Sequence, residues 1–521
     1  MIGFYKGSVN KRFLLATFAI SFFIIILLYS CNSSKNTSAS AGAVTGSALA
    51  HRYCVSCHEF PAPNLIDRKS WVSGVLPAMA KNMGVHSYMG EYYTDPKSTI
   101  NISDWQKIVA YYTSASPVNL NIPKPPVAAS KGWSVFSLVK PKNFNPKSAA
   151  MTTMLSVDTI NHQVYSGDAA GSLFEWDTQL SSKLIYHFDS AVTGITYLKT
   201  PGSANNAIVT CIGNLPPVNL STGKVYSLNL DAGKKNNRPA LIADGLPRPV
   251  ASVAADFNKD GLMDYVTCGF GHDKGGLYYL QQQQDHSYKK IQLSAIAGGE
   301  QLVTGDFNND GWPDVICLFA QADEGIRMFL NDKKGGFITK TLLRFPPAYG
   351  SSSFQLVDFN HDGKPDILYT CGDNSDFSKV FKPYHGIYIF TNQGDWTFKQ
   401  TYFYHIDGCT KAMAADFEHN GKTDIAAIAF FPDFKYQPEE GFTYLEQTGA
   451  NGFTATQLPV STYGRWLEMD VADIDGDGYD DILLGNFAIG GRGLVNQEGF
   501  VPGWDMHNPL ILLKNNAGKK H

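Results

Sequence analysis

The stretch CVSCH at residues 54–58 places two thiols and an imidazole within one short segment. Such a CxxCH pattern could be half of a zinc site, a redox dithiol or the attachment point of a covalent haem. A structural zinc ion needs four ligands, and no second CxxC or HxxxH pattern lies within residues 45–116. A redox dithiol is typical of a βαβ setting, which the surrounding sequence does not show. The pattern therefore predicts haem c, with Cys54 and Cys57 bonded to the porphyrin and His58 bonded to the iron.

Three helices are expected to hold this motif in place. The first covers residues 44–58 and ends in the motif. The second covers residues 67–83, where Trp71, Val75 and Met79 share a face and Pro77 kinks the chain. The third covers residues 102–114, with Ser103 as its N-cap. With this arrangement residues 45–116 resemble a small class I cytochrome c, and the resemblance implies an all-α haem domain that transfers electrons.

The second axial ligand of the iron is open at the level of the sequence. Methionine raises the reduction potential of a haem and is usual in electron carriers. Met79, Met83 and Met89 all follow the motif, and His86 lies between them. Met79 is the first choice because it shares a helix face with Trp71, and the other three residues are alternatives.

The N-terminus predicts export. Lys6, Lys11 and Arg12 precede the apolar run FLLATFAISFFIIILLYS, so residues 1–30 are expected to be a secretory signal peptide. A retained membrane-spanning helix is the alternative, because the run is close to the shortest spanning length. The sequence LLYSC resembles the bacterial lipobox, which implies a lipid on Cys31 and a protein anchored to a bacterial membrane, facing the periplasm or the cell surface. Residues 31–44, rich in Ser and Asn, would be a flexible tether.

Five copies of an acidic loop follow one another at intervals of 50 to 58 residues. Each copy has the pattern D-x-[DNE]-x-[DN]-G-x-x-D, with alternating oxygen ligands, a glycine for a sharp turn and a closing acid. A hard cation requires these features, so the loops predict Ca²⁺ sites; an Asx-rich turn without metal is the alternative. The copy from Asp473 to Asp481 has the most charge, and the copy from Asp416 to Asp424 is the weakest match. The expected ligands are Asp256, Asn258, Asp260, Asp264, Asp306, Asn308, Asp310, Asp314, Asp358, Asn360, Asp362, Asp366, Asp416, Glu418, Asn420, Asp424, Asp473, Asp475, Asp477 and Asp481.

A period near 50 residues indicates a solenoid or a propeller. Each repeat contains four strand-like runs, which is the content of one propeller blade. Residues 145–190 and 191–245 have similar patterns without the acidic loop, so residues 133–521 are expected to form an all-β propeller of seven blades of four antiparallel strands, with six or eight blades still open. Residues 117–132 would be a Pro-rich linker. The acidic loops resemble those of FG-GAP/VCBS-type propellers, as in integrin α-subunits, and the resemblance implies bound calcium.

Strand direction predicts where binding residues gather. If the acidic loops join the first and second strands of each blade, they lie on one face of the disc, and the loops between second and third strands lie on the other. These second-to-third loops are long, and long loops on a rigid scaffold commonly carry function. A solvated rim is the alternative for any single residue. The candidate residues of this face are Arg248, Glu300, Lys382, His385, Lys411, Arg465 and Trp466.

A haem unit joined to a propeller resembles modular periplasmic quinohaemoproteins. The chain is therefore expected to transfer electrons, with the propeller as a platform for a redox partner protein or a small-molecule substrate. The tryptophan-docking repeats of quinone-binding propellers are absent from the sequence. One alternative is a propeller oxidoreductase that passes electrons to its own haem, and another is a non-catalytic recognition propeller stabilised by calcium. A net charge of −4 argues against nucleic acid as a partner.

Overall fold

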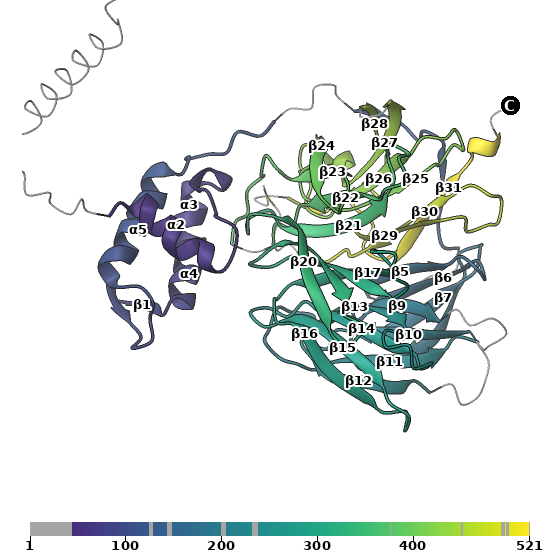
Figure 1. Cartoon of the computed structure of the whole chain (residues 1–521). Helices are drawn as coiled ribbons and strands as arrows, with labels where there is room; N and C mark the ends of the chain where they lie inside the picture. The colour runs from purple at the N-terminus through teal and green to yellow at the C-terminus, as the bar shows by residue number, and fades with distance from the viewer. Residues whose placement is uncertain are drawn as a thin grey trace, which may run out of the picture.

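The structure, a computed structural model, describes residues 44–123, 129–142, 148–198, 205–231, 238–375, 377–449, 452–490, 495 and 500–519. A mainly helical N-terminal unit lies beside a larger all-β body (Figure 1). The expected signal peptide and the expected lipid site at Cys31 fall outside the described residues. Within those residues, no helix combines the length and the apolar character that crossing a membrane requires.

The N-terminal unit begins and ends with capped helices. In α2 (Gly46–Tyr53) the Thr45 hydroxyl accepts the N–H of Ala48 at 3.2 Å. In α5 (Ile102–Ala115) the N-cap is Asn101, which accepts the N–H of Asp104 at 2.8 Å; the expected cap, Ser103, lies inside the helix. Between them lie the 3₁₀ turns η1 (Cys54–Ser56) and η2 (Pro63–Leu65), α3 (Arg68–Ser70), the π-helical turn η3 (Trp71–Val75), α4 (Leu76–Asn82), β1 (Val85–Tyr88) and β2 (Glu91–Thr94).

Two features of this unit differ from the expected arrangement. The single helix expected over residues 67–83 is divided into α3, η3 and α4, because Pro77 lacks an N–H and disturbs the preceding turn. The unit is also not all-α, since β1 and β2 form an antiparallel hairpin. The hairpin turns at Met89 and Gly90, which both have positive φ angles, and its runs VHSY and EYYT are rich in strand-forming residues.

Helices α2 and α5 approach each other closely at Gly46. A Cβ atom at this position would lie 2.1 Å from the carbonyl oxygen of Lys107 and 2.8 Å from the Cβ atom of Tyr111. Glycine is therefore needed for the contact between the two helices. The contact helps to bury one hydrophobic core, which includes Leu49, Trp71, Trp105, Ile108 and Tyr112.

The all-β body is a seven-bladed propeller with four antiparallel strands in each blade, which confirms the predicted fold of this part (Figure 1). The second strands of blades 3 to 7 are buried along their whole length, and their sequences are accordingly apolar runs such as DYVTCG and DVICLF.

Blades 1 to 3 contain β5 (Thr152–Asp158), β6 (Gln163–Asp168), β7 (Ser172–Trp176) and β8 (Ser182–His187); β9 (Val192–Leu198), β10 (Asn206–Cys211), β11 (Gly223–Asn229) and β12 (Ala240–Leu246); and β13 (Pro249–Ala255), β14 (Asp264–Gly269), β15 (Gly276–Gln282) and β16 (Tyr288–Ser294). Blades 4 and 5 contain β17 (Gly299–Gly305), β18 (Asp314–Phe319), β19 (Gly325–Asn331) and β20 (Phe337–Arg344), then β21 (Ser351–Val357), β22 (Asp366–Cys371), β23 (Gly386–Asn392) and β24 (Phe398–His405). Blades 6 and 7 contain β25 (Cys409–Ala415), β26 (Asp424–Ala429), β27 (Phe442–Gly449) and β28 (Gly452–Gln457), then β29 (Trp466–Ala472), β30 (Asp481–Asn486) and β31 (Leu510–Asn515).

Strand β4 (Phe136–Val139) closes the ring. It pairs antiparallel with β31 from the other end of the chain and is the outermost strand of blade 7. The short strand β3 (Ser130–Lys131), inside the stretch expected to be a linker, pairs in parallel with β28 of blade 6. The first strands of adjacent blades contact one another around the ring, as the innermost strands of a propeller do.

The N-terminal unit contacts blades 4 and 5 on the propeller face opposite to the acidic loops. The Tyr384 hydroxyl lies 3.1 Å from the carbonyl oxygen of Leu65 and 3.0 Å from that of Ala348. Arg344 forms an ion pair of 3.8 Å with Glu59. A Cβ atom at Gly74 would lie only 2.8 Å from the carbonyl oxygen of Phe377, so the two backbones meet closely there. We call residues 377–385 the docking loop, because they supply two of these contacts.

Candidate functional site

The five acidic loops join the first and second strands of blades 3 to 7, as expected, and share one backbone geometry. In the first loop Asp256 accepts the N–H groups of Asp260 and Gly261 at 3.1 and 2.9 Å. The same two bonds recur in the other four loops. The fourth and sixth residues of every loop have positive φ angles, and the sixth is always glycine. The loops therefore turn sharply and gather their side-chain oxygens on one side.

The closing acid of each loop begins the second strand and is fully buried. Asp314, for example, accepts the N–H groups of Phe307 and Asn331 at 3.0 and 2.7 Å. Burial raises the pKa of each closing acid above its ordinary value, and that of Asp481 rises to about 6. A nearby cation would favour the ionised form of these buried carboxyls.

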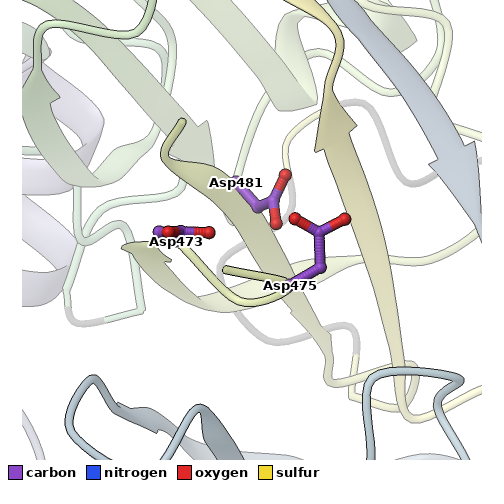
Figure 2. Close-up of side chains that lie close together, drawn as sticks. All are labelled: Asp473, Asp475 and Asp481. Atoms are coloured by element: carbon purple, nitrogen blue, oxygen red, sulfur yellow. The ribbon is translucent and has the colours of Figure 1, made fainter. Parts of the chain in front are cut away.

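The last loop differs from the others in its carboxylates. Oxygens of Asp473, Asp475 and Asp481 lie within 4.8 Å of one another (Figure 2), and no other trio of His, Cys, Asp or Glu ligand atoms in the described chain does so. The ammonium group of Lys514 contacts Asp475 and lies 4.0 Å from Asp477. Carboxylate oxygens of this kind suit a hard cation, and Lys514 shows that the loop attracts positive charge. The other loops have Asn258, Asn308, Asn360 or Glu418 at the third position.

The CVSCH motif lies where α2 passes into η1. Cys54 and Cys57 carry free thiols, with Cys57 exposed and Cys54 partly buried. Burial raises the pKa of the Cys54 thiol. His58 is 8% exposed, and its Nδ1 atom lies 2.8 Å from the carbonyl oxygen of Glu59. A carbonyl only accepts, so Nδ1 carries the hydrogen and Nε2 keeps the lone pair that a metal would use.

The four candidates for the second axial position occupy different surroundings. Met79 and Met83 are partly buried and pack against the core of the N-terminal unit. Met89 is 88% exposed at the tip of the β1–β2 hairpin. The Nε2 atom of His86 lies 3.0 Å from Asp95, which already occupies that ring nitrogen. Met79 and Met83 are thus the two of these four residues that pack against the core of the N-terminal unit.

Arg248 and Arg465 precede the first strands of blades 3 and 7 and fix neighbouring loops. The Arg248 guanidinium donates to the carbonyl oxygens of Asn214, Leu215 and Gly271. In the same way, Arg465 donates to the carbonyl oxygens of Phe430, Ile489 and Gly490. Arg465 is 1% exposed, and its guanidinium lies 3.6 Å from the centre of the Phe430 ring. Both side chains therefore join the second-to-third loops of adjacent blades, and their donors do not face an open binding surface.

Glu300 and Lys411 lie on the innermost strands β17 and β25. Lys411 forms an ion pair of 3.2 Å with Glu468 of β29. Burial, followed by the charges of Asp373, Glu468 and Glu324, raises the pKa of Glu300 well above its ordinary value. Charged groups on the innermost strands of blades 4, 6 and 7 therefore interact with one another across the ring.

Lys382, His385 and Trp466, the other candidates of this face, are buried. The Lys382 ammonium donates to the amide oxygen of Asn374 at 2.7 Å. Trp466 packs in the hydrophobic core shared by blades 6 and 7. The His385 ring is 1% exposed, and its Nε2 atom has no hydrogen-bond partner. The Nε2 atom of His385 and the Nε1 atom of Trp466 are thus both buried without a partner, and neither side chain is open to solvent.

Two groups of residues on this face are missing from the sequence prediction. One is the contact with the N-terminal unit, made by Arg344, Phe377 and Tyr384, for which no sequence pattern gives a signal. The other is a buried cluster of His405, Asp407 and Glu440. The sequence pattern from which this cluster could have been found is the run HIDG, which places a His and an Asp at a very short turn between strands β24 and β25.

Comparisons with known proteins agree with the repeat pattern. The FG-GAP-like repeat family matches residues 256–317 and 306–369. Integrin alpha-6 of Homo sapiens is 25% identical over 227 residues, which cover 40% of this chain and 19% of the integrin. An ancestral GH74 enzyme has a TM-score of 0.44 at 10% identity, covering 71% of this chain and 52% of that one. The WD40 β-propeller domain of Doa1 has a TM-score of 0.42 at 11% identity, covering 73% of this chain and 96% of that one.

The chain thus spans about a fifth of the curated relative, 19% of its length, so the likeness concerns the repeats and not the whole integrin. The matched residues begin with the acidic loop of blade 3 and reach into β22 of blade 5. Together, the matched repeats and the strand order identify this part of the chain as FG-GAP-like repeats within a seven-bladed β-propeller.

Proposed function

We propose that the protein is an exported, lipid-anchored haem c protein that transfers electrons. In this proposal residues 45–116 hold the haem, and the propeller of residues 133–521 is a platform for a redox partner protein or a small-molecule substrate. The observation that carries the proposal is the motif geometry: two free thiols and a His58 ring whose Nδ1 is bound to a backbone carbonyl, which leaves Nε2 for iron.

A buried atom near the motif supports the fit of a haem. The indole Nε1 of Trp105 is buried without a hydrogen-bond partner, although Trp105 lies in the same core as Cys54 and Met79. A buried indole N–H usually finds an acceptor, and the propionate groups of a haem would supply one. The residues present therefore fit the group.

When bound, haem c supplies one-electron chemistry. Cys54 and Cys57 would hold it through thioether bonds, and the carbonyl of Glu59 would fix the orientation of the His58 ring. The Glu59 carboxylate is paired with Arg344 of the propeller, so the residue next to the iron ligand also contacts the platform.

Replacing either motif cysteine should prevent full covalent attachment. We expect the Cys54→Ala and Cys57→Ala variants to lose most covalent haem, as measured by absorbance of the denatured protein and by its mass after export in a host that matures c-type cytochromes. Cys211→Ala is the matched control, because Cys211 is a buried free thiol far from the motif in the sequence. Wild-type protein without covalent haem under these conditions would contradict the proposal.

The axial ligand can be identified in the same preparation. We expect Met79→Leu to lower the reduction potential and to remove the weak absorption band of thioether-bound ferric haem, because a thioether stabilises the reduced iron. Met89→Leu should leave both properties unchanged, since the Met89 side chain is 88% exposed. If Met83→Leu alone produced the change, Met83 would be the ligand; if neither did, the methionine assignment would be wrong.

We infer a structural role for calcium in the propeller. The acidic loops lie on the face opposite to the N-terminal unit, so an ion there would stabilise turns without touching the haem unit. The last loop, where three carboxylates converge, is the strongest candidate.

A second candidate function is recognition of a partner without catalysis by the propeller. Arg248 and Arg465 are buried and donate to backbone carbonyls, so neither is placed to hold the anionic group of a substrate, which favours recognition over an oxidation at this face. The likeness of the repeats to those of integrin alpha-6 also supports recognition of a partner as the function of the propeller.

A further inference from the structure

Three ionisable side chains form a buried cluster between blades 5 and 6. His405 ends β24, Asp407 lies in the turn to β25, and Glu440 lies in the 3₁₀ turn η4 (Pro438–Gly441). Their exposed fractions are 8%, 4% and 7%. His405 Nε2, Asp407 Oδ1 and Glu440 Oε2 are all buried atoms without a hydrogen-bond partner. Buried polar atoms normally have partners, so this cluster needs an explanation.

The contacts of the two His405 ring nitrogens indicate that this cluster binds a proton. Its Nδ1 atom lies 3.0 Å from the carbonyl oxygen of His385, which only accepts, so Nδ1 carries a hydrogen. Its Nε2 atom lies 3.3 Å from Asp407 Oδ1. In a neutral ring that Nε2 would present a lone pair to a carboxylate oxygen, and two acceptors would face each other. The contact is attractive only when the pair carries a second proton.

Two further ionisable groups, Glu440 and His385, lie next to His405 and Asp407, and burial and nearby charges shift their pKa values. Burial, then the charges of Asp407 and Asp433, raise the pKa of Glu440 well above its ordinary value. Burial, then Lys382 and His405, lower the pKa of His385 well below its ordinary value, so this second ring is neutral. Lys382 of the docking loop is the cation next to His385, and Asp433, from the loop before η4, is the further anion next to Glu440.

The cluster is joined to the contact with the N-terminal unit. The carbonyl of His385 accepts hydrogen bonds from the His405 ring and from the N–H of Ile406, at 3.0 and 3.2 Å. His385 follows directly on Tyr384, whose hydroxyl reaches the carbonyl of Leu65 in the N-terminal unit. The end of the docking loop is therefore held by the same ring that needs the proton.

We propose that His405, Asp407 and Glu440 form a buried proton-binding site that fixes the docking loop and so keeps the N-terminal unit on the propeller. The site binds protons more tightly in the docked state than in the open state. The free energy that the site contributes to docking is therefore complete at lower pH. It is lost as the pH rises and the docked site releases its protons. Loss of the protons leaves unpaired buried acceptors, which loosens the docking loop. This inference goes beyond haem binding and can be tested on protein with or without haem.

The test compares the shape of the protein at different pH values by small-angle X-ray scattering. We expect wild-type protein to be compact at about pH 6 and to gain radius of gyration reversibly by about pH 9. In Asp407→Asn, the amide N–H donates to the Nε2 lone pair of a neutral His405, so no second proton is needed. This variant should stay compact across the whole range.

Two control variants calibrate the scattering measurement. Tyr384→Phe removes the hydroxyl that reaches Leu65 and should be open at both pH values, which calibrates the open state. His507→Gln alters an exposed ring that also lies near a backbone carbonyl, that of Ser148, and should behave like wild type. A wild-type shape that does not change with pH, or an Asp407→Asn response equal to that of wild type, would overturn the proposal. A stoichiometric metal ion lost in Asp407→Asn would overturn it as well, because the bound cation would then not be a proton.

Discussion

Gly46→Val is expected to unfold the N-terminal unit while the propeller keeps its own melting transition. The new side chain would enter the space held by the Lys107 carbonyl, which is 2.1 Å from the position of a Cβ atom. Helices α2 and α5 would have to separate, and overpacking of this kind costs about 1–3 kcal/mol or more. A unit of this size has only a few kcal/mol of stability, so the effect should be decisive. Calorimetry and haem content measure it.

The matched control for this change is Ala48→Val. Ala48 lies on the exposed side of the same helix, so this variant loses some helix propensity, which Gly46→Val does not, but introduces no clash. It should retain the N-terminal transition with a small shift. Equal losses in the two variants would show that valine disfavours the helix itself and that the close approach at Gly46 is not needed.

Asp481→Asn is expected to remove most of the stabilisation that calcium gives to blade 7. Asp481 is one of the three converging carboxylates of the last loop, and it is fully buried (Figure 2). An amide keeps the shape and can still accept the N–H of Asn515, now at 2.7 Å from the carboxylate, but it lacks the charge that a hard cation needs. A ligand at 1,000 times its dissociation constant stabilises a protein by about 4 kcal/mol.

Thermal melting with excess calcium and with chelator measures this difference. Wild-type protein should melt at a distinctly higher temperature with calcium, and Asp481→Asn should show a much smaller difference. Asp480→Asn is the control, because it removes one charge from the neighbouring residue, which is not among the three converging carboxylates. If chelator did not shift the wild-type transition, the loops would be metal-free turns.

The propeller could be predicted from the sequence because its signal is repeated. Asp256, Asp306, Asp358, Asp416 and Asp473 each begin a loop at similar spacing, and the four strands between loops are all local patterns. The convergence of carboxylates in the last loop followed from composition alone, since that loop has Asp475 where three others have Asn. Local patterns of this kind can be recognised in a sequence without knowledge of tertiary contacts.

Long-range contacts could not be predicted in this way. Arg465 was interpreted as a surface cation because it precedes a strand, yet its guanidinium is buried among carbonyls of two loops. The β1–β2 hairpin is absent from the sequence prediction, which considers this stretch only for possible axial ligands, although the alternating runs are a usable signal. Nothing near Tyr384 indicates Leu65, which lies 319 residues away in the chain.

The closure of the ring by β4 has a consequence for the order of assembly. The partner of β4 is β31, so blade 7 cannot be completed until residues 510–515 are present. The buried core residues of the N-terminal unit all lie between Leu49 and Tyr112, with only the partly buried Ala348 packed against them from the propeller, so a chain made from its N-terminus can fold this unit long before the ring can close. During that interval Cys54 and Cys57 are free of the propeller surface that later lies beside Glu59. A group attached covalently to these thiols would therefore meet a folded N-terminal unit before the propeller contact at Arg344 exists.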